Sequence, residues 1–239
     1  MKIRSKLIII SSIIVLSIAV YLLIKSSIIE PNKISSIKGI DISNKYPGNL
    51  DWDKLGENKG FVILRAVRSV DTVKTKGIHS FVSMPDSNFK KNWVDLENKN
   101  IIRGAYQRFS ANISAEKQFE IFKNTVDLKK GDLPPFLDIE ESVNINEINR
   151  WIELAKKHYK VEPILYDNSD HFFRNKQSFT GYKIWIYLNP GQPIKSSLKS
   201  INSVIWQYRQ NKLIPGFNEP ADLNEFLGDS VAFKELLIK

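Results

Sequence analysis

Short apolar runs alternate with longer amphipathic stretches through most of the chain. The apolar runs are rich in Ile, Val, Phe, Tyr and Trp, which is typical of β-strands. Seven of them are predicted to form strands, at residues 37–43, 61–67, 101–107, 134–140, 162–166, 183–188 and 203–208. Apolar residues at helical spacing predict helices at residues 87–100, 114–130 and 145–158. Ser114 and Asn144 stand where N-cap residues are expected.

This alternation predicts an α/β fold in which helices pack against a parallel sheet. Seven or more strand units within residues 37–239 fit a closed barrel better than two separate domains. A short eighth strand is expected around Asp222 and Asn224. We therefore expect one irregular (β/α) barrel, TIM-like in its general plan.

The N-terminus has a different pattern, with 18 consecutive uncharged residues at positions 7–24. A helix of that length spans roughly 27 Å, close to the thickness of the hydrocarbon core of a bilayer. Basic residues precede the run and favour a cytoplasmic N-terminus, so the body would lie outside the cytoplasm. No small-residue cleavage site follows, which favours a retained single-pass membrane anchor over a cleaved signal peptide and a secreted product. The expected organisation is a signal anchor or signal peptide at 1–25, a linker at 26–36 and one domain at 37–239.

The amino-acid composition excludes some kinds of catalytic and binding site. The chain has no cysteine, which excludes disulfides and thiolate catalysis. His79, His158 and His171 show no metal-ligand spacing. The net charge of +9 suits either an anionic partner such as nucleic acid or cell wall, or simply a soluble surface.

Acidic and aromatic residues gather where the predicted strands end. The carboxyl ends of parallel barrel strands meet at one mouth, where such folds carry their active sites. The residues at or near these ends are Asp41, Tyr106, Asp138, Glu140, Tyr166, Trp206, Gln207, Tyr208, Asp222 and Asn224. Asp138 and Glu140 stand two apart on one strand, so they are expected to point the same way with Cα atoms roughly 7 Å apart.

Crowded carboxylates beside aromatic rings suit the hydrolysis of a glycosidic bond. That reaction needs one acid to protonate the leaving oxygen and one negative group to stabilise the cationic transition state. Neighbouring carboxylates raise one another's pKa, so that one of them stays protonated. A magnesium or calcium site built from Asp41, Asp138, Glu140 and Asp222 is the alternative. The accompanying aromatic residues favour a sugar substrate, so we expect no metal and no cofactor.

Several of these segments also carry a resemblance to a known family. The segments "KGIDISNKYPGNLDW", "IRGAYQRF", "LPPFLDIE", "VIWQYRQNKLIPG" and "ADLNEF" lie in the family's order between about residues 38 and 228. They resemble glycoside hydrolase family 25 lysozymes, which are N-acetylmuramidases. The resemblance implies an irregular α/β barrel, and a hydrolase that cuts the β-1,4 bond between N-acetylmuramic acid and N-acetylglucosamine in peptidoglycan.

The resemblance also implies roles for single residues. It places the catalytic acid at Glu140 and its companion carboxylate at Asp138. We expect the other site residues to bind substrate: Asp41, Asp222, Tyr106, Tyr166, Trp185, Trp206, Gln207 and Asn224. The expected partners are peptidoglycan glycan strands and, through the N-terminal helix, the membrane; we expect a monomer without a nucleic-acid partner.

The sequence departs from the family pattern in two places. "RAVRSVDT" follows the second strand where the family has a small–acidic–glycine turn, and Gln107 with Arg108 follows "GAY" where histidine is frequent. Both departures are expected beside the pocket and bear on substrate preference. They leave open a second class, a catalytically weak or inactive wall-binding envelope protein with a lysozyme fold. The four acids favour the enzyme.

Overall fold

The computed structural model describes most of the chain from residue 36 onward. The described residues are 36–43, 50–56, 60–74, 78–99, 101–139, 144–188, 198, 201–215, 217 and 220–239. The predicted membrane helix at 7–24, most of the predicted linker and Glu140 lie outside these ranges. Among the helices within them, none is both long enough and apolar enough to cross a bilayer.

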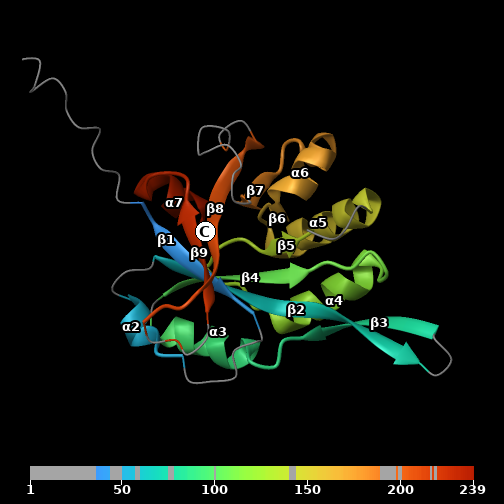
Figure 1. Ribbon diagram of the computed structural model, residues 1–239, viewed down its shortest axis with the longest axis horizontal. Coiled ribbons are helices and arrows are strands. Elements are labelled where there is room, and N and C mark those ends of the chain that lie inside the picture. The colour runs from blue at the N-terminus through green and yellow to red at the C-terminus, as the bar shows by residue number, and fades with distance from the viewer. Residues whose placement is uncertain are drawn as a thin grey trace, which may run out of the picture. The chain divides into compact units, whose positions relative to one another are not determined.

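A closed ring of strands forms the centre of the fold (Figure 1). The strands are β1 (Lys38–Ile42), β2 (Phe61–Lys74), β3 (Ile78–Pro85), β4 (Ile102–Arg108), β5 (Phe136–Asp138), β6 (Ile164–Asn168), β7 (Lys183–Tyr187), β8 (Ser203–Lys212) and β9 (Ala221–Phe226). Hydrogen bonding follows the order β1-β9-β8-β7-β6-β5-β4-β2, and a further parallel pairing of β1 with β2 closes the ring. The predicted barrel is therefore confirmed, including its eighth strand, β9.

The sheet is not parallel throughout, and the prediction needs correction at two strands. β9 runs antiparallel to both β8 and β1. Only residues 213–220 join β8 to β9, which is too short for the crossover that a parallel pair requires. β3, which the apolar pattern did not predict, runs antiparallel to the second half of β2.

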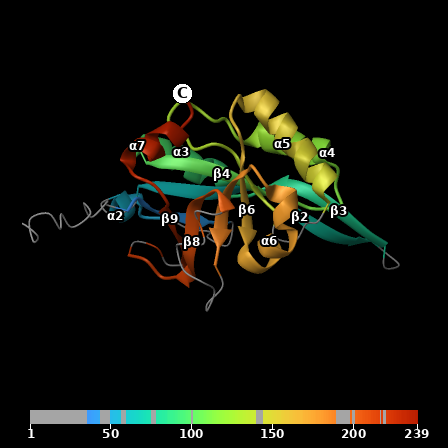
Figure 2. The same cartoon turned by 90° about the horizontal axis from the view of Figure 1, so that it is seen from above.

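Helices surround the barrel in both views (Figures 1 and 2). They are α2 (Trp52–Gly56), α3 (Phe89–Asn98), α4 (Ala115–Thr125), α5 (Ile145–Tyr159), α6 (Ser169–Asn175), the short 3₁₀ helix η1 (Lys176–Phe179) and α7 (Ser230–Leu236). The three predicted helices correspond to α3, α4 and α5.

The two predicted N-caps have different outcomes. The Asn144 side chain accepts a hydrogen bond from the Glu147 backbone N–H at 3.4 Å, as expected of a cap. Ser114 occupies the N-cap position of α4, but its side chain makes no capping hydrogen bond. The Ala115 N–H at that end instead donates to Glu147 Oε2 at 2.6 Å, so a carboxylate from α5 caps α4 and joins the two helices.

Strand alternation divides the core into two layers. The inner layer fills the barrel with side chains that include Phe61, Ile63, Phe136, Trp185 and Ile205, each at most 1% exposed. The outer layer lies between the strands and the helices. Gly39 and Gly104 face inward, where an added Cβ would collide with the rings of Phe61 and Phe136 respectively. These glycines leave room for the aromatic side chains that fill the barrel.

The hairpin of β2 and β3 extends away from the barrel in both views (Figures 1 and 2). Residues 61–64 of β2 pair with β1, whereas residues 67–74 pair with β3. The hairpin therefore continues past the carboxyl end of the barrel part of β2. It stands at the edge of the barrel mouth.

Candidate active site

Strand register brings the predicted site residues together at the barrel mouth. Asp41 is the cross-strand partner of Asp222, and Asp138 is the partner of Tyr166. A cavity of about 220 Å³ opens between them. The residues that line it are Asp41, Ser43, Arg65, Tyr106, Arg108, Asp138, Tyr166, Trp185, Gln207, Gln210, Asn211 and Asp222.

Asp41 lies at the centre of a hydrogen-bond network in this cavity. Its Oδ1 accepts hydrogen bonds from Gln207 Nε2 and from Asn224 Nδ2, both at 2.8 Å. Gln207 and Asn224 are themselves cross-strand partners and are almost fully buried. The carboxyl group is therefore held by two amides in a fixed orientation.

Two aromatic side chains extend the network. Tyr166 donates its hydroxyl hydrogen to Gln207 Oε1 at 2.9 Å. The Trp185 indole N–H donates to Asn224 Oδ1 at 2.8 Å. The Tyr166 and Trp185 rings lie 4.5 Å apart between centroids. The acid, the amides and the aromatic rings are thus connected in one hydrogen-bond network. Asn224 is part of this network although it does not line the cavity.

Burial is the largest cause of a raised pKa at Asp41, and the negative charges of Asp222 and Asp138 also raise it. The two amide hydrogen bonds lower it, and the resulting pKa is about 8. Asp41 is therefore mostly protonated at neutral pH. Burial likewise raises the pKa of Tyr106 well above 10, so this side chain remains a phenol.

Asp138 ends β5 and faces the cavity, where it is 5% exposed. Its backbone oxygen accepts a hydrogen bond from the Phe109 N–H at 2.9 Å. Arg108, its cross-strand partner on β4, places Nε 3.8 Å from Asp138 Oδ2. The strand predicted to reach Glu140 ends at Asp138, so the relation between these two carboxylates stays a prediction.

Two sequence-predicted positions lie elsewhere. Trp206 does not line the cavity; it packs on the outer layer of the core, with its ring centroid 5.6 Å from that of Tyr208. Its neighbour Gln207 faces inward, and adjacent residues of a strand face opposite ways. Gln107 also points outward, where its Oε1 accepts a hydrogen bond from the Trp151 indole N–H at 3.0 Å. Of the departure at Gln107 and Arg108, only Arg108 reaches the cavity.

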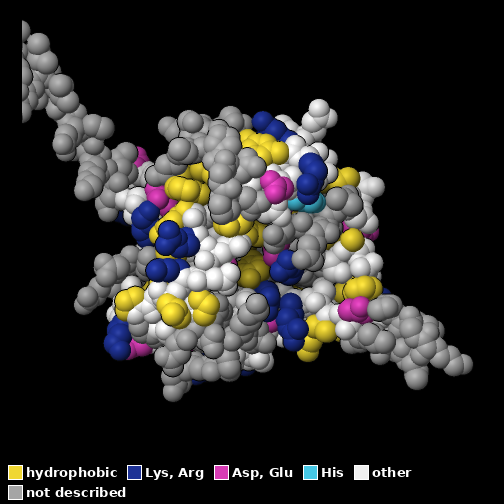
Figure 3. All heavy atoms as spheres, in the orientation of Figure 1, with side chains coloured by type: hydrophobic (Ala, Val, Ile, Leu, Met, Phe, Trp, Pro, Cys, Tyr) yellow, Lys and Arg dark blue, Asp and Glu magenta, His cyan; other side chains and the backbone are white. Residues whose placement is uncertain are grey.

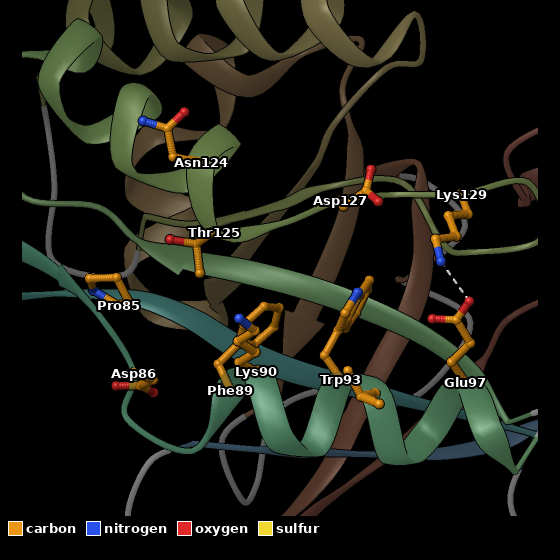
Figure 4. Close-up of a pocket in the computed structure, with 11 residues that line it drawn as sticks. Pro85, Asp86, Phe89, Lys90, Trp93, Glu97, Asn124, Thr125, Asp127 and Lys129 are labelled. Atoms are coloured by element: carbon orange, nitrogen blue, oxygen red, sulfur yellow. Dashed lines mark hydrogen bonds and ion pairs between the residues drawn. The ribbon is translucent and has the colours of Figure 1, made fainter.

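A larger cavity of about 430 Å³ lies outside the barrel, between α3 and the segment that follows α4 (Figure 4). Phe89 and Trp93 lie along it, and Lys129 is paired with Glu97 at its rim. The Arg103 guanidinium lies over the Trp93 ring at 4.1 Å from the centroid. This cavity contains none of the predicted site residues.

The described residues contain no group of three His, Cys, Asp or Glu side chains placed to hold a metal ion. Residues 40–217 match the family model described as glycosyl hydrolases family 25.

The chain belongs to glycoside hydrolase family 25. It is therefore a glycoside hydrolase. A solved family 25 glycosyl hydrolase from Bacillus anthracis is 28% identical, covers 83% of this chain and 92% of its own, and superposes with a TM-score of 0.66. The bacterial lysozyme from Streptomyces coelicolor shares the fold, with a TM-score of 0.67 at 19% identity over 84% of this chain and 96% of its own. The protein YegX of Escherichia coli K12 is 26% identical over an alignment of 219 residues, which covers 86% of this chain and 75% of YegX.

Proposed function

We propose that this family 25 enzyme is a lysozyme that hydrolyses the β-1,4 bond between N-acetylmuramic acid and N-acetylglucosamine in peptidoglycan. The observation that carries the proposal is the network at the barrel mouth, where Asp41, Asp138 and Asp222 line one cavity with Tyr106, Tyr166 and Trp185. Carboxyl groups supply the proton and the negative charge, and aromatic rings pack against sugar rings. Structural relatives of the same fold include proteins described as a lysozyme and as a muramidase.

In the proposed mechanism Glu140 is the general acid. It follows Asp138 by two residues, just beyond the carboxyl end of β5. Glu140 protonates the glycosidic oxygen as the bond breaks. Asp138 then stabilises the positive charge on the sugar, either directly or by holding the acetamido group of the substrate while that group attacks the anomeric carbon. In either route water then adds to the anomeric carbon and gives a proton to the Glu140 carboxylate, which restores the acid.

Asp41 acts in this scheme as a neutral hydrogen-bond donor. Its raised pKa of about 8 keeps the proton on the carboxyl group at neutral pH. Because Oδ1 already accepts from Gln207 and Asn224, the proton is directed to Oδ2, which can donate to a polar group of the sugar. A neutral Asp41 also limits the negative charge that surrounds the general acid.

We also propose that residues 7–24 retain the enzyme at the cytoplasmic membrane, with the barrel outside the cytoplasm. The linker of about ten residues gives a root-mean-square reach of roughly 15–20 Å, which suits local remodelling of the cell's own wall. Membrane fractionation followed by intact-mass measurement tests this. A soluble product that begins near residue 26 or later would show a secreted enzyme instead.

The enzymatic proposal is tested by incubating purified peptidoglycan with the full chain in mild detergent and measuring new reducing ends. We expect a steady release by the wild type and none above background with Glu140→Gln, which keeps size and hydrogen bonding but cannot deliver the proton. A folded wild-type protein that releases no reducing ends over a range of pH and salt would refute the proposal.

A further inference from the structure

Strand β8 is irregular where it passes the barrel mouth. Between its pairs Gln207–Asn224 and Arg209–Leu223 with β9, β8 has one residue more than its partner strand. The same occurs again before Lys212, so β8 carries two bulges close together. Bulges redirect the side chains of a strand, and they are frequent beside active sites.

The bulges bring the Gln210 side chain into the cavity at the barrel mouth. In a regular strand, a residue three positions after Gln207 would face the other way. Gln210 nevertheless lines the cavity together with Gln207. Asn211 follows with a left-handed backbone at a φ of 54°, and its N–H donates to Asp222 Oδ1 at 2.7 Å, which holds this stretch of β8 at the mouth. The face drawn in Figure 3 is hollowed near its centre, and uncharged polar groups border the hollow together with Lys and Arg side chains.

Gln210 contacts the amide that in turn contacts Asp41. Its Nε2 donates to Gln207 Oε1 at 3.0 Å, and the Tyr166 hydroxyl donates to the same oxygen at 2.9 Å. Gln207 Nε2 donates to Asp41 Oδ1 at 2.8 Å. An amide oxygen has two acceptor sites, so these two donors complete its hydrogen bonding. They favour the orientation in which the nitrogen of Gln207, and not its oxygen, faces Asp41.

The orientation of the Gln207 amide affects Asp41 directly. Burial is the largest cause that raises the pKa of Asp41, and the hydrogen bond from Gln207 lowers it. If the amide turned, Asp41 would lose this donor and its pKa would rise further. Among the described residues, the other titratable or charged groups around Asp41 in the cavity are Asp222, Asp138, Tyr106, Tyr166, Arg65 and Arg108.

We propose that Gln210 is a positioning residue that acts on Asp41 through the amide of Gln207. The two bulges of β8 place it in the cavity, and the hydrogen bond to Gln207 Oε1 is the contact through which it acts. Its effect on cleavage rests on the proposed muramidase function, in which Asp41 is a neutral donor. Its effect on the titration of Asp41 is independent of that function and can be measured without a substrate.

The test is urea denaturation of the full chain in mild detergent from about pH 5 to about pH 10. The proteins are the wild type, Gln210→Met, Tyr166→Phe and the double variant. Methionine has a similar length to glutamine but cannot donate a hydrogen bond. Each protein is compared with the same protein carrying Asp41→Asn, so that the titration of all other groups cancels. Relative to this counterpart, the stability of the wild type should fall with rising pH and level off near pH 8, the folded-state pKa of Asp41.

Gln210→Met should move the pH at which this fall ends upward, because Asp41 loses a well-oriented donor and keeps its proton to higher pH. In the single variant the Tyr166 hydroxyl still holds Gln207, so we expect a shift of about half a pH unit or less. In the Tyr166→Phe background no donor to Gln207 Oε1 is left. There Gln210→Met should add about one pH unit, which is the tenfold change in proton affinity that a hydrogen bond to a charged group contributes.

Two further variants serve as controls. Gln210→Ala removes the same donor without the bulk of methionine and should give the same shifts. Gln177→Met changes an exposed glutamine on η1 and should give none. The absence of a shift from Gln210→Met in both backgrounds overturns the positioning role, whether or not peptidoglycan is cleaved. A loss of stability that is equally large with and without Asp41→Asn would show a purely structural role for Gln210 and overturns it as well.

The pH profile of cleavage then connects the positioning to the reaction. If Asp41 acts as a neutral donor, kcat/KM should decrease at high pH, and this decrease should begin at a higher pH in Gln210→Met than in the wild type. A shifted unfolding curve with an unchanged alkaline limb, or with no cleavage at all, would support the positioning by Gln210 and count against the proposed function alone.

Discussion

Asp41→Asn should stabilise the protein by an amount that grows with pH. Burial and two neighbouring carboxylates raise the pKa of Asp41 from 3.8 to about 8 in the folded state. Between these values the folded protein holds a proton that the unfolded chain releases, so wild-type stability falls as pH rises through this window. Asparagine carries no such proton, and its side-chain oxygen can accept the same hydrogen bonds from Gln207 and Asn224.

The size of this stability difference follows from the pH range between the pKa of Asp41 in the unfolded chain and that in the folded protein. Each pH unit above 3.8 costs the wild type about 1.4 kcal/mol until the pH approaches 8. At pH 7 the accumulated difference is about 4 kcal/mol, a large fraction of the 5–15 kcal/mol that typically stabilises a domain. The two proteins should be nearly equally stable at pH 4.

Urea denaturation at pH 4, 5, 6 and 7 measures this difference. Glu120→Gln, which removes an exposed carboxylate on α4, is the matched control and should follow the wild type. A difference in the free energy of unfolding between Asp41→Asn and wild type that stays constant from pH 4 to pH 7 would refute a raised pKa at Asp41. Retention of cleavage within about tenfold in Asp41→Asn would agree with its role as a neutral donor.

Three further substitutions test the site. Glu140→Gln should keep the circular dichroism spectrum and lower kcat about 10²–10⁴-fold, which is the usual contribution of general acid–base catalysis. Near wild-type turnover would show that another residue is the general acid, and Asp41 would be the next candidate. Tyr166→Phe removes the 2.9 Å hydrogen bond to Gln207 Oε1 and should cost about 1 kcal/mol in urea unfolding, together with a several-fold loss of kcat/KM; unchanged values for both would show that the network is dispensable. Trp206→Phe should leave kcat and KM within about twofold of the wild-type values, because the ring packs outside the barrel. A large rise in KM would show that Trp206 contributes to substrate binding.

The barrel could be predicted because its strands are buried on both faces and its helices are amphipathic. Short apolar runs and helical spacing then identify the barrel strands and the helices α3, α4 and α5 directly. The direction of a strand cannot be predicted in this way, because the periodicity of an apolar run is the same whether the strand is parallel or antiparallel. The antiparallel β9 follows from the short connection at 213–220, a signal that the apolar pattern alone does not use.

The β2–β3 hairpin could not be predicted from burial. Phe81, Val82 and Met84 of β3 are between 37% and 47% exposed, so β3 lacks the one-sided pattern that marks a half-buried strand. In the site, the sequence predicted that Asp41, Asp138 and Asp222 meet at the barrel mouth, but it did not predict their hydrogen-bond partners. Treating Trp206 and Gln207 as one pocket group ignored the alternation of a strand, which sends the tryptophan outward and the glutamine to Asp41.

In the proposed reaction the barrel mouth cuts the glycan of peptidoglycan at the muramic acid side of the β-1,4 bond. Mass spectrometry of the products released from purified peptidoglycan, after borohydride reduction of the new ends, tests it most directly. We expect the wild type to yield fragments with reduced N-acetylmuramic acid at the new end, and Glu140→Gln to yield none. Fragments that end in reduced N-acetylglucosamine, or intact glycan strands after incubation with folded wild-type protein, would contradict it.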